Sequence, residues 1–398
     1  MPKRILVITP RFPLPDTGAC EQDRLEGIKQ LKRLGFEVSV ISKIFSFQDR
    51  GLVEKFSRDF GIPVKLLAYE NKFGLKRLLN PIYWDGAAYE YSGSEIKKTV
   101  ESWADSWKPD MVWFDYTYLW PLYSVFRKRE TAIITRSINF EPFHFLQEDG
   151  FSFINLIKSA AKFLSEMITI LKSDFLFAIT PKEERLYRML GAKNTAILPL
   201  RGLSGRLKGG RQIKESEALN VFFSGSTYSV PHNRKALGFM VKKVIPIIDK
   251  KKPGRFVFHI TGRKFPSELK MYLNEHIIYN GLVRDWDSFV GDMDIALVPS
   301  LYGAGMQQKI FEPLSGGIPT IASSRGLAGY PFENEKHLLL AESPEDFAKN
   351  LIRLEDAGLR RILSENAYNL SSELFSHEAM DGKVLEAINS INVRDKRI

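Results

Sequence analysis

Short apolar segments alternate with amphipathic helical patterns along this chain, and the series occurs twice. The segments are apolar on both faces, which is typical of strands in a parallel sheet covered by helices. The segments expected to be strands are 4–9, 37–42, 111–115, 131–135, 175–180 and 194–199, then 220–225, 256–262, 276–281, 294–299, 318–323 and 337–342. Helical patterns such as residues 21–35 and 231–249 separate them. The sequence therefore predicts an α/β protein with two doubly wound parallel-sheet domains.

The middle of the chain interrupts this alternation. Residues 201–219 contain glycine, lysine and serine in place of an apolar period, so we interpret them as a linker. The predicted domains are therefore residues 1–200 and 220–375. A chain of 398 residues is too long for one ordinary core and about right for two.

Charge and cysteine content restrict the partners. The formal net charge is +10 and is spread evenly over both halves, which favours a small anionic ligand over nucleic acid. Cys20 is the only cysteine, which excludes an internal disulfide framework and a cysteine-based metal cage. No apolar run has the length of a signal-peptide core or of a spanning helix. We therefore expect a cytoplasmic protein.

Residues 151–172 form a strongly amphipathic helical pattern. One face carries Phe153, Ile157, Ala160, Leu164, Met167 and Leu171, and the other carries Asn155, Lys162, Glu166 and Thr169. We expect the apolar face to pack against the core, as such faces usually do. A helix lying on a membrane is the alternative, because lysines flank the apolar face. Residues 71–84 have a similar composition and the same two interpretations.

Ligands of open parallel sheets bind beyond the carboxyl ends of the strands, so candidate residues are sought there. Gly18 precedes the first helix, where a missing side chain would let a ligand approach backbone N–H groups. An ordinary turn is the alternative. Asn139, Glu141 and His144 follow another strand, and a glutamate or histidine there could orient or deprotonate a sugar hydroxyl. A lone histidine beside aromatic residues is more often structural.

The second half offers stronger candidates. Gly225 and Ser226 end one predicted strand and Arg263 ends the next. The segment "GAGMQQKIFEPLSGG" (303–317) then places a helix start directly after a third strand. Its N–H groups and Lys309 could hold a diphosphate without a metal and stabilise the charge that develops when it leaves.

Two further residues of this segment matter. Glu312 lies on the same helix face as Lys309, so it is either an ion-pair partner of that lysine or an acceptor for two ribose hydroxyls. Pro313 lacks an N–H group and disfavours helical geometry at the residue before it. We therefore expect the helix to begin near Ile310 or to be kinked.

On these segments the chain resembles the GT-B-fold glycosyltransferases of family 4, which transfer a sugar from a nucleotide diphosphate sugar with retention and usually without a metal. The resemblance covers nearly the whole chain. It implies two Rossmann-like domains facing across a cleft and a final helix, near residues 376–392, that packs on the first domain. The segments that carry it are "RILVITPRFPLPDTG", "LKRLGFEVSVIS", "KSDFLFAITPKEERLYRMLGAKNTAILPLRG", "FSGSTYSVPHNRKAL", "GLVRDWDSFVGDMDIALVPS" and "GMQQKIFEPLSGGIPTIAS".

The resemblance also implies roles for residues. Glu312 matches the second glutamate of the family's Glu–seven residues–Glu motif, which binds the ribose. The implied donor-binding residues are Gly18, Gly225, Ser226, Arg263, Arg284, Gly305, Met306, Gln307, Gln308, Lys309 and Glu312. Lys309, Glu312 and Arg263 are the implied catalytic residues, and Asn139, Glu141 and His144 lie on the acceptor side. The implied acceptor is a glycan or a lipid-linked saccharide, no cofactor or metal is implied, and brief peripheral contact with the inner face of a membrane is compatible with the basic amphipathic segments.

The chain departs from the family pattern at two positions. The first glutamate of the pair is replaced by Ala304, and in "RSINFE" the expected histidine is replaced by Ile138. These losses motivate an alternative, a catalytically impaired descendant that binds a nucleotide or a glycan. Nucleic-acid binding is a third hypothesis, motivated by the net charge alone.

Overall fold

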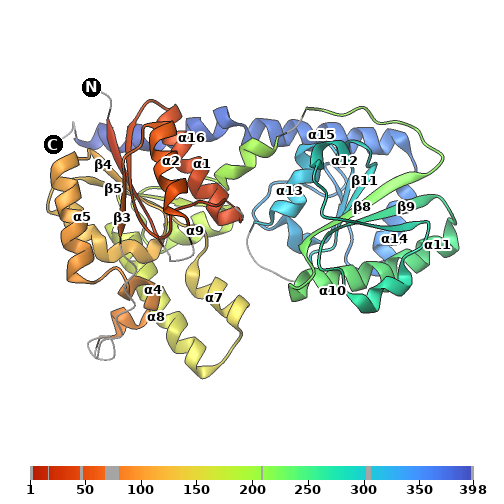
Figure 1. Cartoon of the computed structure of the whole chain (residues 1–398), viewed down its shortest axis with the longest axis horizontal. Coiled ribbons are helices and arrows are strands. Elements are labelled where there is room, and N and C mark those ends of the chain that lie inside the picture. The colour runs from red at the N-terminus through yellow and green to blue at the C-terminus, as the bar shows by residue number, and fades with distance from the viewer. Residues whose placement is uncertain are drawn as a thin grey trace. The chain divides into compact units, whose positions relative to one another are not determined.

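The chain divides into two compact units in the computed structural model (Figure 1). Unit 1 comprises residues 1–204 and 377–398, and unit 2 comprises residues 205–376. The structure describes residues 3–16, 18–44, 48–67, 80–207, 209–301 and 306–395. Of the amphipathic segment 71–84, residues 71–79 lie outside this range, as do Ala304 and Gly305.

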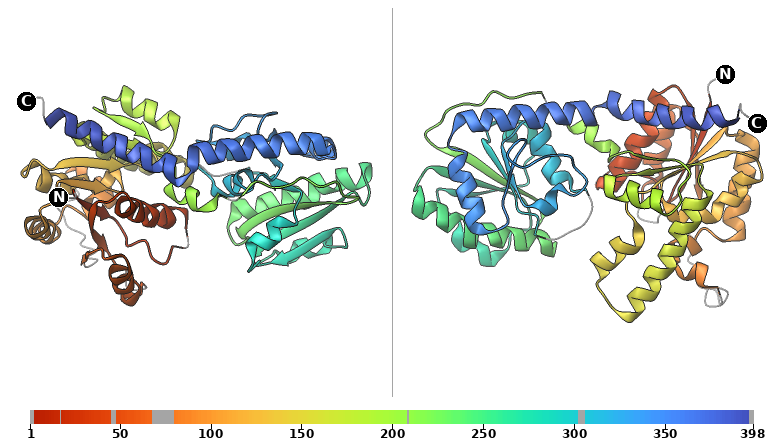
Figure 2. Two further views of the ribbon diagram at one scale, coloured as in Figure 1. Left: turned by 90° about the horizontal axis from the view of Figure 1, so that it is seen from above. Right: turned by 180° about the vertical axis from the view of Figure 1, so that it is seen from behind.

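Unit 1 is built on a seven-stranded parallel sheet in the order β3-β2-β1-β4-β5-β6-β7, with helices on both faces (Figure 2). The strands are β1 (Arg4–Thr9), β2 (Glu37–Lys43), β3 (Val64–Leu67), β4 (Met111–Phe114), β5 (Ala132–Arg136), β6 (Phe175–Ala178) and β7 (Thr195–Ile197). The helices are α1 (Ala19–Arg33), α2 (Arg50–Phe60), α4 (Gly86–Tyr89), α5 (Ser94–Trp107), α6 (Tyr123–Arg127), α7 (Glu141–Asp149), α8 (Phe153–Lys172), α9 (Pro181–Met189) and α16 (His377–Asp395). Short 3-10 helices are η1 (Pro81–Trp84), η2 (Thr117–Leu122) and η3 (Arg201–Arg206).

Unit 2 has a six-stranded parallel sheet in the order β10-β9-β8-β11-β12-β13. The strands are β8 (Leu219–Thr227), β9 (Phe256–Arg263), β10 (Ile277–Gly281), β11 (Ile295–Val298), β12 (Thr320–Ala322) and β13 (Leu339–Leu340). The helices are α10 (Pro231–Phe239), α11 (Ile245–Lys251), α12 (Trp286–Gly291), α13 (Gln308–Ser315), α14 (Pro344–Arg353) and α15 (Ala357–Phe375), with a π-helical turn, η4 (Met240–Val244), and the 3-10 helices η5 (Ser267–Tyr272) and η6 (Ser324–Leu327). The prediction of two doubly wound parallel sheets is confirmed.

The last helix, α16, belongs to unit 1. Its Asp381 accepts hydrogen bonds from Gln30 and from Arg33 on α1, at 2.9 to 3.0 Å. The boundary between the units, after Ser204, falls inside η3, so the first residues of the segment interpreted as a linker are helical and belong to unit 1.

A buried charge network joins α1, β5 and η3 within unit 1. The carboxylate of Asp23 is fully buried and accepts from the guanidinium groups of Arg136 and Arg201 at 2.9 Å. Arg201 also lies 3.2 Å from Asp115. The two arginines hold the pKa of Asp23 well below its usual range despite its burial.

The expected orientation of α8 is wrong. Its apolar face is exposed, with Phe153, Ile157, Leu164 and Leu171 all open to solvent. Its polar face is buried, because the structure opposite is polar as well: Thr169 donates to the Thr117 carbonyl at 2.7 Å, and Glu166 accepts from the Thr117 hydroxyl at 2.8 Å. None of the helices in the described ranges is long and apolar enough to cross a membrane.

Candidate donor and acceptor sites

Three of the expected donor-binding segments meet at one edge of the unit 2 sheet. Ser226 lies at the end of β8, Arg263 ends β9, and α13 begins after β11. The strands are parallel, so these ends share an edge, and the chain reverses its direction of winding between the neighbouring strands β8 and β11. This reversal point is where open α/β sheets bind ligands. Arg284, by contrast, follows the edge strand β10 and is exposed.

The glycines at these strand ends are required by packing. A Cβ on Gly262, whose φ is +130°, would lie 2.0 Å from the carbonyl oxygen of Gly225. A Cβ on Gly225 would lie 2.8 Å from the ring of Tyr228, whose hydroxyl donates to the Thr261 carbonyl at 2.6 Å. Gly225 is itself buried, whereas Ser226 and Arg263 are exposed. The side chains of Ser226 and Arg263 are therefore the groups at this edge that a ligand can reach.

Helix α13 begins earlier than expected. Its first residue is Gln308, two residues before the expected start near Ile310, and it continues through Pro313; the alternative of a kink stays a prediction. The proline is tolerated because its missing N–H removes one bond, to the carbonyl of Lys309 in the first turn. Gln307 occupies the N-cap position without a side-chain cap and accepts at its Oε1 from the Ser300 hydroxyl at 2.7 Å. Nothing acidic lies in the first turn.

Lys309 stands in that first turn as a partly buried cation. Its ammonium group has no hydrogen bond or ion pair to the residues that the structure describes, and burial lowers its pKa to about 8. A positive charge beside an uncapped helix N-terminus is unfavourable, because both carry the same sign. An anion bound here would compensate the buried charge of Lys309 and its repulsion from the helix N-terminus.

Glu312 does not pair with Lys309, although both lie on α13. It forms an ion pair with Arg206 of η3, and about a quarter of each of these two side chains remains exposed (25% and 28%). Arg206 is anchored from α13 as well, because Ser315 donates to its carbonyl at 3.3 Å. Sequence reasoning missed Arg206, which is distant in the chain and belongs to no recognised motif. Met306, before the helix, is buried.

In unit 1, Gly18 precedes α1 as expected, but a carboxylate already faces it. A Cβ on Gly18 would lie 2.5 Å from Oε2 of Glu21, in the first turn of α1. Glu21 pairs with Arg11 and, at 3.1 Å, with Arg24. The positive end of α1 is thus compensated by a side chain of its own, unlike that of α13.

A cavity of about 320 Å³ opens at the carboxyl edge of the unit 1 sheet. Two of its lining residues, Tyr116 and Tyr118, stack with ring centroids 5.0 Å apart. The buried ammonium of Lys43, which also lines it, lies 3.0 Å from Glu90 and 4.0 Å from the ring centroid of Tyr91. The remaining lining residues are Pro10, Arg11, Cys20, Glu21, Arg24 and Ala87. Sequence reasoning missed this cavity. Its signal is "DYTY", which lies at the carboxyl end of a predicted strand, where ligands of such sheets bind.

Asn139, Glu141 and His144 follow β5 at the same edge of this sheet. Glu141 opens α7 and lies 3.8 Å from the ammonium of Lys162, and burial raises the pKa of Glu141. The Nδ1 atom of His144 is buried without a partner in the described part of the chain. Burial raises the pKa of Tyr118 and the charge on Glu141 raises it further, so this cluster and the cavity are neighbours.

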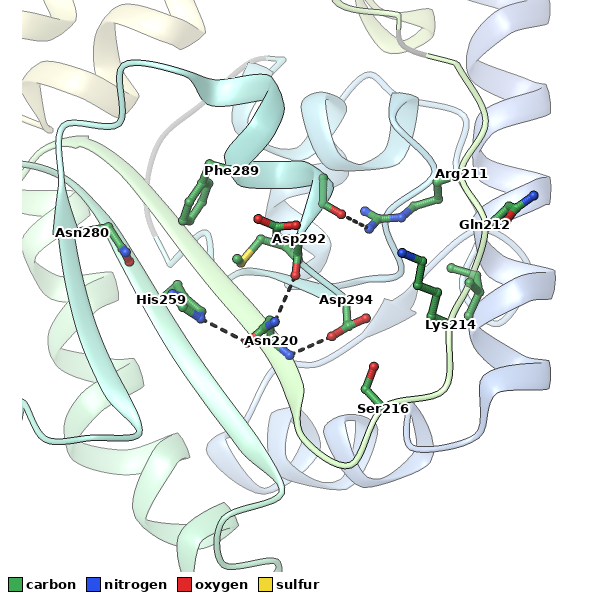
Figure 3. A pocket seen from close by; sticks show the side chains of 13 residues that line it. Arg211, Gln212, Lys214, Ser216, Asn220, His259, Asn280, Phe289, Asp292 and Asp294 are labelled. Carbon is green, nitrogen blue, oxygen red and sulfur yellow. Dashed lines mark hydrogen bonds between the residues drawn. The ribbon is translucent and has the colours of Figure 1, made fainter.

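A second cavity, of about 530 Å³, lies in unit 2 at the amino ends of β8 and β11 and contains none of the expected site residues (Figure 3). Asn220 organises it: its backbone N–H donates to Asp294 at 2.8 Å, and its side chain donates to the Asp292 carbonyl at 3.1 Å and accepts from His259 at 3.2 Å. The polar groups of Asn220, His259, Asp292 and Asp294 are thus hydrogen-bonded within the cavity wall.

No group of three or more histidine, cysteine or acidic side chains able to hold a metal occurs within the described ranges.

Residues 218–356 match the family described as "Glycosyl transferases group 1". No curated protein matches the chain in sequence. Many solved structures do match in fold.

Three of these structures span both units. Sucrose-phosphate synthase from Thermosynechococcus elongatus is 14% identical, with a TM-score of 0.65, and the match covers 98% of this chain and 100% of that one. HepE from Anabaena, solved with UDP-glucose, is 14% identical with a TM-score of 0.61 (97% and 99% covered). TarM from S. aureus, a mutant solved with fondaparinux, alpha-GlcNAc-glycerol and UDP, is 10% identical with a TM-score of 0.63 (97% and 100%). At such identities the likeness shows the fold, which is the expected GT-B fold.

Proposed function

We propose that the chain is a glycosyltransferase that moves a sugar from a nucleotide diphosphate sugar to a glycan or lipid-linked acceptor, with retention and without a metal. The match of residues 218–356 to the glycosyl transferases of group 1 supports this proposal. The observation that carries this proposal is the position of Lys309. It is a partly buried cation without a partner in the described residues, in the first turn of an uncapped helix, next to the strand pair where the winding reverses. A diphosphate supplies the missing counter-charge.

The proposed roles of the other donor-binding residues follow from the position of Lys309. The N–H groups at the start of α13 and the ammonium of Lys309 hold the diphosphate, with Arg263 and Ser226 reaching it from the ends of β9 and β8 and Arg284 at the rim. Glu312 accepts from two ribose hydroxyls, which requires its carboxylate to exchange Arg206 for the nucleoside.

The proposed reaction is a substitution on one face of the donor sugar. The bond from the anomeric carbon to the diphosphate oxygen breaks, and a bond from that carbon to the acceptor oxygen forms on the same face. The acceptor proton passes to the departing diphosphate oxygen. Lys309, Arg263 and the helix start stabilise the charge that this oxygen gains, and they act more strongly in a partly buried site than in water.

The acceptor is proposed to bind unit 1. The stacked rings of Tyr116 and Tyr118 offer an apolar platform for a sugar ring, and the Lys43–Glu90 pair offers charge-assisted hydrogen bonds. Glu141, with Asn139 and His144, continues this surface and is suited to orient the reacting hydroxyl. We propose that the acceptor is a precursor of a cell-surface polysaccharide and that the transfer takes place in the cytoplasm.

The alternative is an impaired enzyme that binds its donor but does not turn it over. Where the family pattern has histidine, the chain has Ile138, whose side chain is buried and carries no polar group for a substrate. The family's first glutamate is likewise replaced by Ala304.

One experiment separates these possibilities. A panel of UDP-, GDP- and ADP-sugars is titrated by calorimetry against the wild type, Lys309→Ala, Glu312→Ala and the control Lys270→Ala, an exposed lysine of the same unit. UDP-sugars come first because HepE was solved with UDP-glucose. We expect one donor to bind the wild type and the control equally and the two site variants more weakly. If none binds the wild type, the proposal fails; binding without nucleotide release over a broad acceptor panel supports the impaired enzyme.

A further inference from the structure

Helix α8 is amphipathic in the opposite sense to an ordinary surface helix. The residues with the highest exposure lie at its start and in the preceding turn: Phe151 is 82% exposed, Phe153 78% and Ile154 65%. Further along, the exposed large apolar side chains are Leu156, Ile157, Phe163, Leu164 and Leu171. Contiguous exposed apolar surface of this kind marks an interaction site.

The buried face of α8 explains why the helix cannot rotate to hide these residues. Ser165 donates to Asp85 at 2.8 Å and accepts from the indole N–H of Trp120 at 3.1 Å. Glu166 is fully buried and accepts from the hydroxyls of Thr117, at 2.8 Å, and Tyr187, at 3.2 Å. Rotation would strand all of these polar groups without partners.

The charges on the exposed face have one sign. Lys158 and Lys172 are exposed on α8, and the only carboxylate of the helix is the buried Glu166. Asp149, which ends α7, is the acidic residue nearest in sequence on the other side of the turn. The exposed face of α8 is thus apolar and basic, the combination by which helices bind the interface of an anionic bilayer.

The shape of unit 1 presents this face outward. Helices α7 and α8 form a hairpin (residues 141–172), and the views agree that its turn points away from the sheet (Figures 1 and 2). The three most exposed large apolar side chains of α8 and the preceding turn, those of Phe151, Phe153 and Ile154, lie at or next to that turn. A convex tip with aromatic side chains can enter a lipid interface, whereas it offers little surface to a flat protein partner.

We propose that the α7–α8 hairpin docks unit 1 onto an anionic lipid bilayer. Phe151, Phe153 and Ile154 enter the interfacial region, and Lys158 and Lys172 contact lipid phosphates. A second copy of the chain fits less well, because pairing two exposed α8 faces would bring lysines against lysines without a carboxylate on either face. The hairpin tip contains none of the proposed donor- or acceptor-binding residues, so docking can be tested without turnover.

The test uses the full chain in a flotation assay with vesicles of phosphatidylcholine alone and of phosphatidylcholine with phosphatidylglycerol. We expect the wild type to float with the anionic vesicles. The partition coefficient of the triple variant Phe151→Ser, Phe153→Ser, Ile154→Ser should be at least tenfold lower. Lys158→Glu with Lys172→Glu weakens it on the order of tenfold. The matched control is Met271→Ser, which removes an equally exposed apolar side chain (81%) from unit 2.

Measurements of the melting temperature and of the oligomeric state serve as controls. The melting temperature of the triple variant should equal that of the wild type, because the replaced side chains are exposed. Absence of flotation by the wild type, or equal flotation by the triple variant, overturns the proposal. So does concentration-dependent dimerisation of the wild type that the triple variant abolishes, since the hairpin would then bind a second copy.

Discussion

Glu312 and Arg206 form an ion pair within unit 2, although Lys309 lies one turn from Glu312 on the same helix. The arrangement leaves Lys309 without an ion pair to the described residues, as the proposed diphosphate site requires. If Glu312 binds the ribose, replacing Arg206 should not abolish donor binding, whereas replacing Glu312 should.

The first prediction concerns recognition of the ribose. Glu312→Ala should weaken binding of the nucleotide diphosphate on the order of 10- to 100-fold, because two charge-assisted hydrogen bonds are lost. Titration with the 2′,3′-dideoxy nucleotide provides the control, since it lacks both hydroxyls. The wild type should bind this analogue as weakly as the variant does; a variant that still discriminates between the two nucleotides would exclude the role.

The second prediction follows from the pKa of Lys309, which burial lowers to about 8. An anionic ligand favours the charged amine, so binding raises this pKa and takes up a proton near pH 8. Calorimetry in buffers of different ionisation enthalpy should detect the uptake, and affinity should fall above pH 8. Lys309→Arg keeps its charge and should bind without uptake; persistence of the uptake in that variant assigns it to another group.

The third prediction concerns stability and Glu166. Burial raises the pKa of Glu166 to about 8, so the folded chain holds a proton that the unfolded chain releases near pH 4.5. Stability from this group is complete below pH 4.5 and is lost as the pH rises through 8. Denaturant unfolding from pH 5 to 9 should show the wild type losing stability relative to Glu166→Gln, with no further change above pH 8. Glu54→Gln, at an exposed position of unit 1, should track the wild type.

The fourth prediction concerns the buried network around Asp23. Asp23→Asn leaves Arg136 buried without its counter-charge and leaves Arg201 with Asp115 alone, which should cost about 3 to 5 kcal/mol of unfolding free energy. The exposed pair of Arg4 and Glu37, at 2.8 Å, is the comparison. Glu37→Gln should cost less than about 1 kcal/mol. Equal losses in the two variants would mean that burial of the network does not govern its contribution.

The fifth prediction tests the acceptor platform. Tyr118→Leu should raise the KM for the acceptor and leave nucleotide binding unchanged, because the ring that stacks on Tyr116 is lost from unit 1 alone. Tyr118→Phe keeps the ring and should retain most of the acceptor affinity. Steady-state kinetics with both substrates varied makes the measurement. A change confined to the donor KM would remove Tyr118 from the acceptor site.

The strands that were predicted correctly are mostly buried on both faces, so their composition alone identified them. β3 was missed because its four residues, "VKLL", are mostly half-exposed at the edge of the sheet and lack a distinct apolar run. The pattern predicts α13 between the right strands, but it predicts too late a start, because Pro313 falls late in this short helix and does not prevent helical geometry before it.

Two features depended on residues far apart in the chain. Periodicity showed that α8 has an apolar and a polar face, but the direction of each face was set by Asp85 and Thr117, which precede the helix and offer it polar partners. The partner of Glu312 was equally inaccessible, because nothing in the sequence places η3 beside α13. Residue patterns identify a surface, whereas the tertiary contacts decide what it meets.

The close approach of Gly225 and Gly262 limits how this enzyme can be engineered. A saturation library over residues 225, 226, 262 and 263 would return functional diversity at positions 226 and 263 only, since any larger residue at the two glycines collides with the opposite strand end or with Tyr228. Attempts to alter the proposed donor site should therefore randomise Ser226 and Arg263 and keep the glycines constant.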